Sequence, residues 1–197
     1  MSLSDLLSTK IILASKSPRR KELLSKLVSD FDIITSDADE TLPEGMHPKD
    51  GVRLLAERKG EVVLPLAPSD ALIISSDTLV ELDGVALGKP KDESDAENML
   101  LSLSDREHNV HTGVAVHYKG RVYSGVDSCA VRFKKMTLDE ARDYVKTGEP
   151  MDKAGSYAIQ GLGARFVEGY RGDYNAIVGL GLNLTEALIN EALKNDR

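Results

Sequence analysis

Short, continuously apolar runs alternate with amphipathic stretches along the first half of the chain. The apolar runs are typical of buried strands and lie at residues 10–15, 31–35 and 71–77. The amphipathic stretches carry apolar residues at helical spacing and lie at residues 18–28, 48–63 and 92–104. Alternating strand and helix patterns of this kind favour a domain in which helices cover a sheet.

The middle of the chain has the pattern of β-hairpins. Residues 78–90 (TLVELDGVALGKP) contain Asp83-Gly84, a dipeptide that favours a tight hairpin turn. Residues 109–134 form two long strand patterns that meet at Lys119-Gly120. Because hairpins place neighbouring strands antiparallel, the expected sheet is mixed, and the fold class is α/β or α+β.

The last third returns to helical patterns. Residues 137–148 have Thr137 as an N-cap, Glu140 in the capping-box position and Gly148 as a stop signal. Seven of the sixteen glycines follow at 155–181, and residues 184–194 close the chain as an amphipathic helix. No repeat or linker divides the sequence, so we expect a single domain over residues 1–197.

Composition excludes several classes of protein. The 197 residues are 41% hydrophobic and 29% charged, which is ordinary for a globular protein in water. One cysteine, Cys129, excludes an internal disulfide framework and favours a reducing compartment. The first residues do not have the pattern of a signal peptide, and no apolar stretch is long enough to span a membrane. The net charge of −7 argues against a broad nucleic-acid-binding face.

Several common catalytic and nucleotide-binding motifs are missing from the sequence. It has no G-x-x-x-x-G-K-[ST], H-E-x-x-H, G-x-S-x-G or C-x-x-C, and GLGARF fails G-x-G-x-x-G at its last position. His108 and His111 are three residues apart in an expected strand. Side chains at that spacing point to opposite faces, so this pair is not expected to share a metal.

The stretch LASKSPRRKELL (13–24) is a candidate anion site. A strand ends in small residues here, and Pro18 opens a helix whose first N–H groups are unpaired. Ser15 and Ser17 add hydroxyl donors, while Arg19 and Arg20 add guanidinium groups suited to phosphate oxygens. The alternative is a solvated turn in which Ser17 only caps the helix.

The segment IISSDTLV places a carboxylate where an apolar strand emerges. Asp77, next to Thr78, could hold Mg²⁺ or take a proton from water, or could merely start a turn. Lys89, between Gly88 and Pro90, could reach a phosphate or could be an exposed loop lysine.

Two further segments offer polar side chains. The acidic loop 36–47 carries Asp37, Asp39 and Glu40, any of which could contribute a metal ligand or could simply be solvated. Lys59, on the helix that follows, could project toward the same place. The segment DKAGSYAIQG (152–161) carries Lys153 and Gln160; the Gln160 amide could pair with a base edge, or the segment could be a structural loop. Together these residues could supply cations for phosphates, carboxylates for a divalent metal and an amide for a nucleobase.

The sequence blocks resemble the Maf family. LASKSPRR is similar to the family's L-A-S-x-S-P-R-R signature. The later blocks follow in the family's order over about residues 11–184, and they read DET, SDTLV…LGKP, HTGVAV, DKAGSYAIQG and GDYNAIVGL. The sequence departs from the family pattern at Pro150-Met151, at Gly181 and at Gly60. None of these departures touches the candidate catalytic positions.

The resemblance implies an enzyme. Maf proteins are cytoplasmic nucleoside triphosphate pyrophosphatases that release a monophosphate and pyrophosphate with a divalent metal, Mg²⁺ or Mn²⁺. The implied fold is an elongated, two-lobed α/β body with a deep central cleft, similar to inosine triphosphatases. The expected partner is the triphosphate, and a second copy of the chain is a further candidate.

The resemblance also implies roles for individual residues. Asp77 matches the proton acceptor, with Glu40 as a second candidate metal ligand. The positions of substrate choice correspond to Arg19, Thr78 and Gln160, and the threonine resembles the subgroup that prefers dTTP and UTP. Polar positions that line the cleft correspond to Glu40, Lys59 and Lys89. Two alternatives stay open: the same chemistry on another nucleotide such as 7-methyl-GTP, and a nucleotide-binding regulator of septum formation without turnover.

Overall fold

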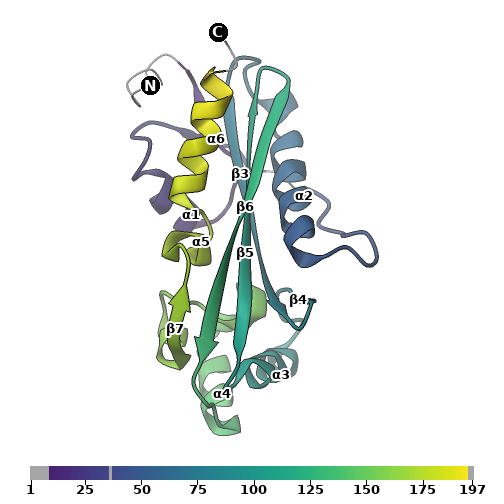
Figure 1. The fold of residues 1–197 in the computed structure, drawn as a ribbon, viewed down its shortest axis with the longest axis vertical. Coiled ribbons are helices and arrows are strands. Elements are labelled where there is room, and N and C mark those ends of the chain that lie inside the picture. Colours follow the sequence, from purple (N-terminus) through teal and green to yellow (C-terminus); the bar gives the residue numbers. More distant parts are fainter. Residues whose placement is uncertain (1–8, 36, 195–197) are drawn as a thin grey trace.

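The computed structural model describes residues 9–35 and 37–194, which form a single α/β domain around one mixed sheet (Figure 1). The strands are β1 (Ile11–Leu13), β2 (Asp32–Ile33), β3 (Leu72–Leu82), β4 (Val85–Leu87), β5 (Glu107–Tyr118), β6 (Arg121–Phe133) and β7 (Val167–Arg171). They lie in the order β2-β1-β3-β5-β6-β7, and β4 pairs with β3. The contacts of β1 with β2 and β3 are parallel and the others are antiparallel, which confirms the expected mixed sheet.

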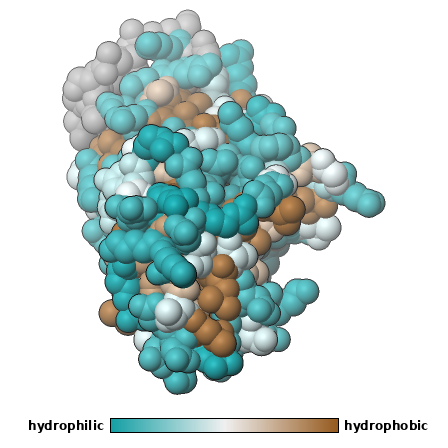
Figure 2. Space-filling model, turned by 60° about the horizontal axis from the view of Figure 1, so that its bottom comes forward, coloured by the Kyte–Doolittle hydropathy of each residue, from teal (hydrophilic) through white to brown (hydrophobic). Residues whose placement is uncertain are grey.

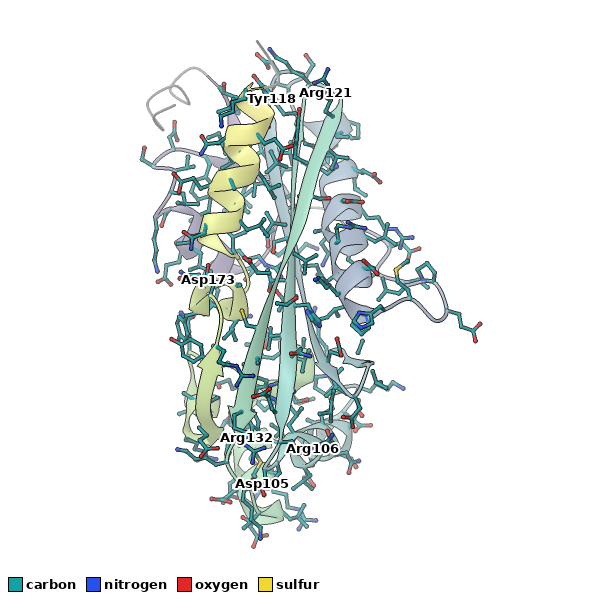
Figure 3. The ribbon with its side chains drawn as sticks, viewed as in Figure 1. Asp105, Arg106, Tyr118, Arg121, Arg132 and Asp173 are labelled. Carbon is teal, nitrogen blue, oxygen red and sulfur yellow. The ribbon has the colours of Figure 1, made fainter. Side chains whose placement is uncertain are left out.

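Six α-helices pack around this sheet in the described residues. They are α1 (Pro18–Leu24), α2 (Pro48–Glu61), α3 (Glu93–Leu103), α4 (Leu138–Val145), α5 (Tyr174–Val178) and α6 (Leu182–Lys194). The molecule is elongated because the β5–β6 hairpin runs along most of its length, with α1, α2 and α6 near one end and α3 and α4 near the other (Figure 1). Figure 3 shows Tyr118 and Arg121 at one end of this hairpin and Arg132 at the opposite end.

The two faces of the sheet are covered by different helices. Ser75 of β3 donates a hydrogen bond to the carbonyl oxygen of Ala56 in α2 at 2.7 Å. On the other face, Thr112 of β5 donates to the carbonyl oxygen of Ala176 in α5 at 2.7 Å. The main apolar core lies on this second face and includes Val114 of β5 and Leu188 of α6. Alternation along β3 and β5 therefore decides which helices each side chain meets.

Within residues 9–35 and 37–194, no strand pairs with one edge of β3 at its centre. On that side β1 pairs with residues 72–74 and β4 pairs with residues 80–82, whereas β5 covers the opposite edge continuously from Ile73 to Glu81. Residues 75–79 consequently lie in a gap between two partner strands.

Both predicted hairpin turns are confirmed. Asp83 and Gly84 have φ values of 52° and 81°, and Lys119 and Gly120 have 47° and 75°. Such positive φ values at two central residues suit the right-handed twist of a hairpin. The Thr137–Glu140 capping box is present, and Gly148 has a left-handed φ of 76° just beyond α4.

Other predictions need correction. Helix α1 ends at Leu24 rather than near Val28, because Lys26 and Leu27 already form three-residue turns with Leu23 and Leu24. The run 71–77 and the first arm of the following hairpin are one continuous strand, β3. The sequence patterns did not predict β7 or α5, which are only five residues each and lie in the glycine-dense region.

Hydrophilic residues predominate on the face that Figure 2 shows, and hydrophobic residues form small groups among them. No helix in residues 9–35 and 37–194 is both long and apolar enough to cross a membrane. The deep cleft implied by the family resemblance stays a prediction.

Candidate active site

The loop between β1 and α1 is held by its own hydroxyl groups. The Ser15 hydroxyl accepts a hydrogen bond from the backbone N–H of Ser17 at 3.2 Å. Ser17 caps α1 by accepting from the backbone N–H of Arg20 at 3.4 Å, and Pro18 occupies the first helical position. The predicted N-cap is thus confirmed, and Arg19 and Arg20 lie in the first turn of α1. Whether Ser15 and Ser17 also contact substrate stays a prediction.

Asp77 lies in the gap in the sheet edge. Its position at a strand end was predicted wrongly, because β3 continues to Leu82 and Asp77 pairs with Gly113 at its centre. The residue is only 8% exposed. An ionised carboxylate this deeply placed needs a partner of opposite charge.

Lys59 of α2 supplies that partner and joins two carboxylates. Its Nζ forms an ion pair with Oδ1 of Asp77 and a second one with Oε1 of Glu40 at 2.7 Å. The hydrogen bond from Lys59 is the main reason that the pKa of Glu40 lies below its usual range, and the charges of Lys89 and Arg20 lower it further. The structure therefore brings together Asp77, Lys59 and Glu40, three predicted residues from three separate segments.

Arg20 occupies the opposite face of β3. Its Nε donates to the carbonyl oxygen of Gly179 at 2.9 Å, and its terminal nitrogen donates to the Thr78 hydroxyl at 3.3 Å. Burial lowers the pKa of Arg20, and the negative charge of Asp77 opposes that shift. An arginine guanidinium remains protonated in proteins, so this cation persists beside the carboxylate.

Thr78 is part of a chain of hydroxyl groups. Its oxygen lies 2.9 Å from the hydroxyl oxygen of Thr112, which donates its single hydrogen to the carbonyl oxygen of Ala176 at 2.7 Å. Thr78 is therefore the donor to Thr112 and the acceptor from Arg20. Because successive strand residues point to opposite faces, Asp77 faces α2 while Thr78 faces α5. A direct contact of Thr78 with the nucleobase of the substrate stays a prediction.

The two arginines are not equivalent. Arg20 is anchored by Gly179 and Thr78, whereas the described residues show no hydrogen bond or ion pair from the Arg19 guanidinium. The charge of Arg19 contributes to lowering the pKa of Asp152. The contact of Arg19 with substrate stays a prediction.

The remaining predicted residues surround this centre less closely. Lys89 is exposed and acts on Glu40 through its charge. Lys153 forms an ion pair with Asp152, and its loop is tied to the Lys89 loop by a hydrogen bond from the N–H of Gly155 to the carbonyl oxygen of Gly88 at 3.0 Å. Gln160 is exposed, and its role in base recognition stays a prediction.

The acidic loop contributes one carboxylate to this centre and uses two elsewhere. Asp37 pairs with Lys16 at 2.7 Å, and Asp39 accepts from the backbone N–H of Thr41 at 2.9 Å. The described residues contain no group of three or more His, Cys, Asp and Glu side chains arranged to hold a metal. Asp77 and Glu40, however, converge on one cation, the Lys59 ammonium. Two carboxylates fit Mg²⁺, which commonly takes its other ligands from water and substrate phosphates.

The network behind the site was only partly visible in the sequence. Thr112, Ser76 and the carbonyl of Gly179 were not singled out, yet Ser76 donates to that carbonyl at 2.8 Å from a fully buried position. Alternation along the strands could have placed Thr78 and Thr112 on one face, but their register could not be read from the sequence.

Known proteins resemble the chain over most of its length. The sequence matches the family described as "Maf-like protein" over residues 10–192. A "dTTP/UTP pyrophosphatase" of Vibrio vulnificus (strain YJ016) is 44% identical over 92% of this chain and 98% of its own length. A protein of the same name from Clostridium botulinum (strain Eklund 17B / Type B) is 46% identical over 93% of this chain and 100% of its own.

Solved structures share the fold at much lower identity. The Ham1 protein of Staphylococcus aureus covers 93% of this chain with a TM-score of 0.54 and 14% identity, and 99% of that protein is matched. A HAM1 protein from Coxiella burnetii covers 95% of this chain and 99% of its own, with a TM-score of 0.51 and 13% identity.

Proposed function

The chain belongs to the Maf-like protein family, and from this premise we propose that it hydrolyses nucleoside triphosphates, with dTTP and UTP as substrates, to the monophosphate and pyrophosphate. The relatives that are 44% and 46% identical bear the name dTTP/UTP pyrophosphatase, which supports this substrate class. The observation that carries the proposal is the 8% exposed Asp77, paired with Lys59 in the gap of the sheet edge and close to the charge of Arg20.

Asp77 is the proposed base. Water attacks the α-phosphorus in line with the bond to the oxygen that bridges the α- and β-phosphates, and Asp77 takes the proton of that water. The bridging bond breaks and pyrophosphate leaves with the electron pair. The ion pair with Lys59 fixes the direction of the Asp77 carboxylate.

The surrounding cations can stabilise the negative charge on the phosphates during this reaction. Arg20 is anchored at two atoms, so it presents positive charge without having to reorganise. Lys89 and Arg19 can meet the leaving pyrophosphate and the remaining phosphate oxygens. Asp77 and Glu40 are the proposed holders of Mg²⁺ or Mn²⁺, which would neutralise phosphate charge when bound.

The reducing compartment expected from a single cysteine supports a cytoplasmic location, where the nucleotide pools lie. There the enzyme would remove unwanted triphosphates. The alternative substrate, 7-methyl-GTP, and the alternative of a non-catalytic binder make different predictions in the following assay.

The decisive experiment is Asp77→Asn, assayed by pyrophosphate release from a panel of triphosphates with Mg²⁺ or Mn²⁺. Loss of the base should reduce turnover of dTTP and UTP about 10³-fold. The asparagine side chain keeps the shape of the carboxylate and can still accept from Lys59, so the melting temperature should change little. Asp32→Asn is the matched control, because Asp32 forms an exposed ion pair with Lys10 at 2.6 Å.

Full turnover by Asp77→Asn would overturn the assignment of the base. Turnover confined to 7-methyl-GTP would overturn the substrate assignment, and nucleotide binding without release of pyrophosphate by the wild type would favour the regulator.

A further inference from the structure

A second group of polar side chains crosses the α2-facing side of the sheet, starting at the next pair on that face after Asp77 and Gly113. His111 of β5 is directly opposite Ser128 of β6, and its Nδ1 lies 2.8 Å from the Ser128 hydroxyl oxygen. Its other ring nitrogen, Nε2, lies 2.6 Å from Oε2 of Glu81 in β3. Three adjacent strands thus hold a serine, a histidine and a carboxylate in one hydrogen-bonded line.

The exposure of the three side chains differs along this line. The side chains of His111 and Glu81 are only 5% and 10% exposed, whereas Ser128 is an exposed residue. A buried imidazole between a carboxylate and a solvent-facing hydroxyl is held in one orientation by both neighbours. Ser128 is therefore exposed to solvent, while the ring of His111 is held in place.

The hydrogen-bond partners decide the tautomer of a neutral His111. A carboxylate only accepts hydrogen bonds, so Nε2 carries the hydrogen that is donated to Glu81. Nδ1 is then bare and accepts the hydrogen of the Ser128 hydroxyl. In this state His111 is oriented to remove the proton of Ser128, which is the arrangement that activates serine nucleophiles.

One more titratable group faces this line. His47, the N-cap of α2, has Nε2 3.9 Å from Oε2 of Glu81, and its ring centroid lies 6.4 Å from that of His111. Its Nδ1 accepts from the backbone N–H of Lys49 at 3.2 Å, which fixes its ring. A carboxylate with two imidazoles beside it is well placed to stabilise positive charge that develops on either ring.

We propose that Ser128 is an activated nucleophile that accepts acyl groups from activated esters. In the reaction the Ser128 oxygen bonds to the ester carbonyl carbon, and its proton passes to Nδ1 of His111. The bond from that carbon to the alcohol oxygen breaks, and the alkoxide or phenolate leaves with the electron pair. The proton on His111 then passes to the leaving group or to water, so the products are acyl-Ser128 and the free alcohol.

The proposal uses only a base and an oriented hydroxyl group. General-base assistance contributes about 10²-fold to 10⁴-fold to such reactions. The acyl-serine is an ordinary alkyl ester with a poorer leaving group than an activated ester, so its hydrolysis should be slower than its formation. The expected signature is accumulation of one acyl group on Ser128.

The chain contains a matched control serine. Ser124 lies on the same strand and the same face, and its hydroxyl donates to Oε1 of Glu57 at 2.5 Å. It therefore has a carboxylate partner where Ser128 has an imidazole. A carboxylate is a weaker base near neutral pH, so Ser124 should acylate far more slowly.

The experiment exposes the full-length protein to p-nitrophenyl acetate near pH 7.5 and measures acetylation of each serine by peptide mass spectrometry over time. We expect Ser128 to acetylate at least about 100-fold faster than Ser124. Ser128→Ala should abolish the fast adduct, and Ser124→Ala should leave it unchanged. His111→Asn should lower the rate at Ser128 to that of Ser124.

Because His111 is buried, His111→Asn could also disturb the fold, and Glu81→Gln provides a second test. The glutamine amide oxygen keeps the hydrogen bond to Nε2 but the charge that stabilises the protonated ring is lost, so the rate should fall about tenfold. Melting curves of each variant establish that it is folded. Equal acetylation of Ser128 and Ser124 in the wild type, or an unchanged Ser128 rate in folded His111→Asn or Glu81→Gln, would overturn the proposal.

Discussion

Two consecutive residues of β3, Asp77 and Thr78, belong to different environments. Asp77 points to the α2 side, where it pairs with the Lys59 ammonium beside Glu40. Thr78 points to the α5 side, where it joins Arg20 to Thr112 through hydroxyl groups. On one face, two carboxylates form ion pairs with one lysine. On the other face, hydrogen bonds lead from Arg20 through Thr78 to the buried Thr112.

The contrast extends along the two faces. The α2 side also carries the line of Glu81, His111 and Ser128, whereas the α5 and α6 side carries most of the apolar core. Charged groups are tolerated where partners and water are near, and burial among apolar side chains penalises them. The following experiments test whether the α2 side supplies chemistry and the opposite side supplies positioning and stability.

The largest effect is expected from Lys59→Met. The change removes the cation between Asp77 and Glu40, so hydrolysis of dTTP should fall about 10²-fold to 10³-fold in kcat/KM. The pKa of Glu40 should rise toward its ordinary value, since the hydrogen bond from Lys59 is the main cause of its lowering. Lys10→Met is the control, because its pair with Asp32 is more than half exposed on both sides, and activity should not change. A wild-type kcat/KM in Lys59→Met would contradict the proposal that the α2 side of the sheet supplies the chemistry.

Thr112→Val tests the opposite face. Thr112 is fully buried, and losing its hydroxyl leaves the carbonyl of Ala176 without that donor and Thr78 without its acceptor. The free energy of unfolding from urea titration should fall by about 1–3 kcal/mol. Thr112→Ser keeps the hydroxyl and should recover part of that loss. If valine proved neutral while Arg20 kept its position in a crystal structure, the network would have no structural role.

Protonation of His108 tests how strongly the apolar side of the sheet disfavours a buried charge. His108 bonds to the hydroxyl of Tyr157 at 2.8 Å, and burial lowers its pKa from 6.5 to about 4. The unfolded chain therefore binds more protons between these values, so stability falls as pH drops from 6.5 toward 4. The difference between pH 7 and pH 5 amounts to about 2 kcal/mol for this group.

The measurement is urea unfolding at both pH values for the wild type and for His108→Gln. The variant should lose about 2 kcal/mol of the pH dependence. An identical pH dependence in both proteins would show that folding does not lower the pKa of His108.

The smallest effect concerns how closely α2 approaches the sheet. A Cβ on Gly60 would overlap Nδ1 of His117 and would lie 2.9 Å from the Ser75 hydroxyl. Overpacking costs typically 1–3 kcal/mol, and the better helix propensity of alanine offsets about 1 kcal/mol. Gly60→Ala should therefore destabilise the protein by about 1 kcal/mol. In a His117→Ala background the cost should shrink, because only the close contact with the Ser75 hydroxyl remains, and a double-mutant cycle measures the coupling.

Local signals predicted much of the fold. Each hairpin turn required two residues that accept positive φ, and Asp83-Gly84 and Lys119-Gly120 met that requirement. Pro18 after Ser17, and Thr137 with Glu140, marked helix starts by satisfying free N–H groups. The short β7 and α5 lacked such signals, because five residues hold too few periods for a hydrophobic pattern to stand out.

The candidate site was predicted as a list of residue types and only in part as an arrangement. The family resemblance pointed to Asp77, Lys59 and Glu40, and the structure joins them through the Lys59 ammonium group. The resemblance did not reveal that Asp77 lies mid-strand, nor that Thr78 bonds to Thr112. The first depends on where β1 and β4 stop pairing, and the second on the register of β3 with β5.

By itself, the sequence determined the turns, the helix caps, the alternation along the strands and the family to which the chain belongs. These depend on residues close together in the chain or on whole-length similarity. Only the tertiary structure decided which carboxylates share a lysine, which arginine is anchored and which serine meets a histidine. Each of these pairs joins residues at least 17 positions apart, so strand register and helix packing set their distances.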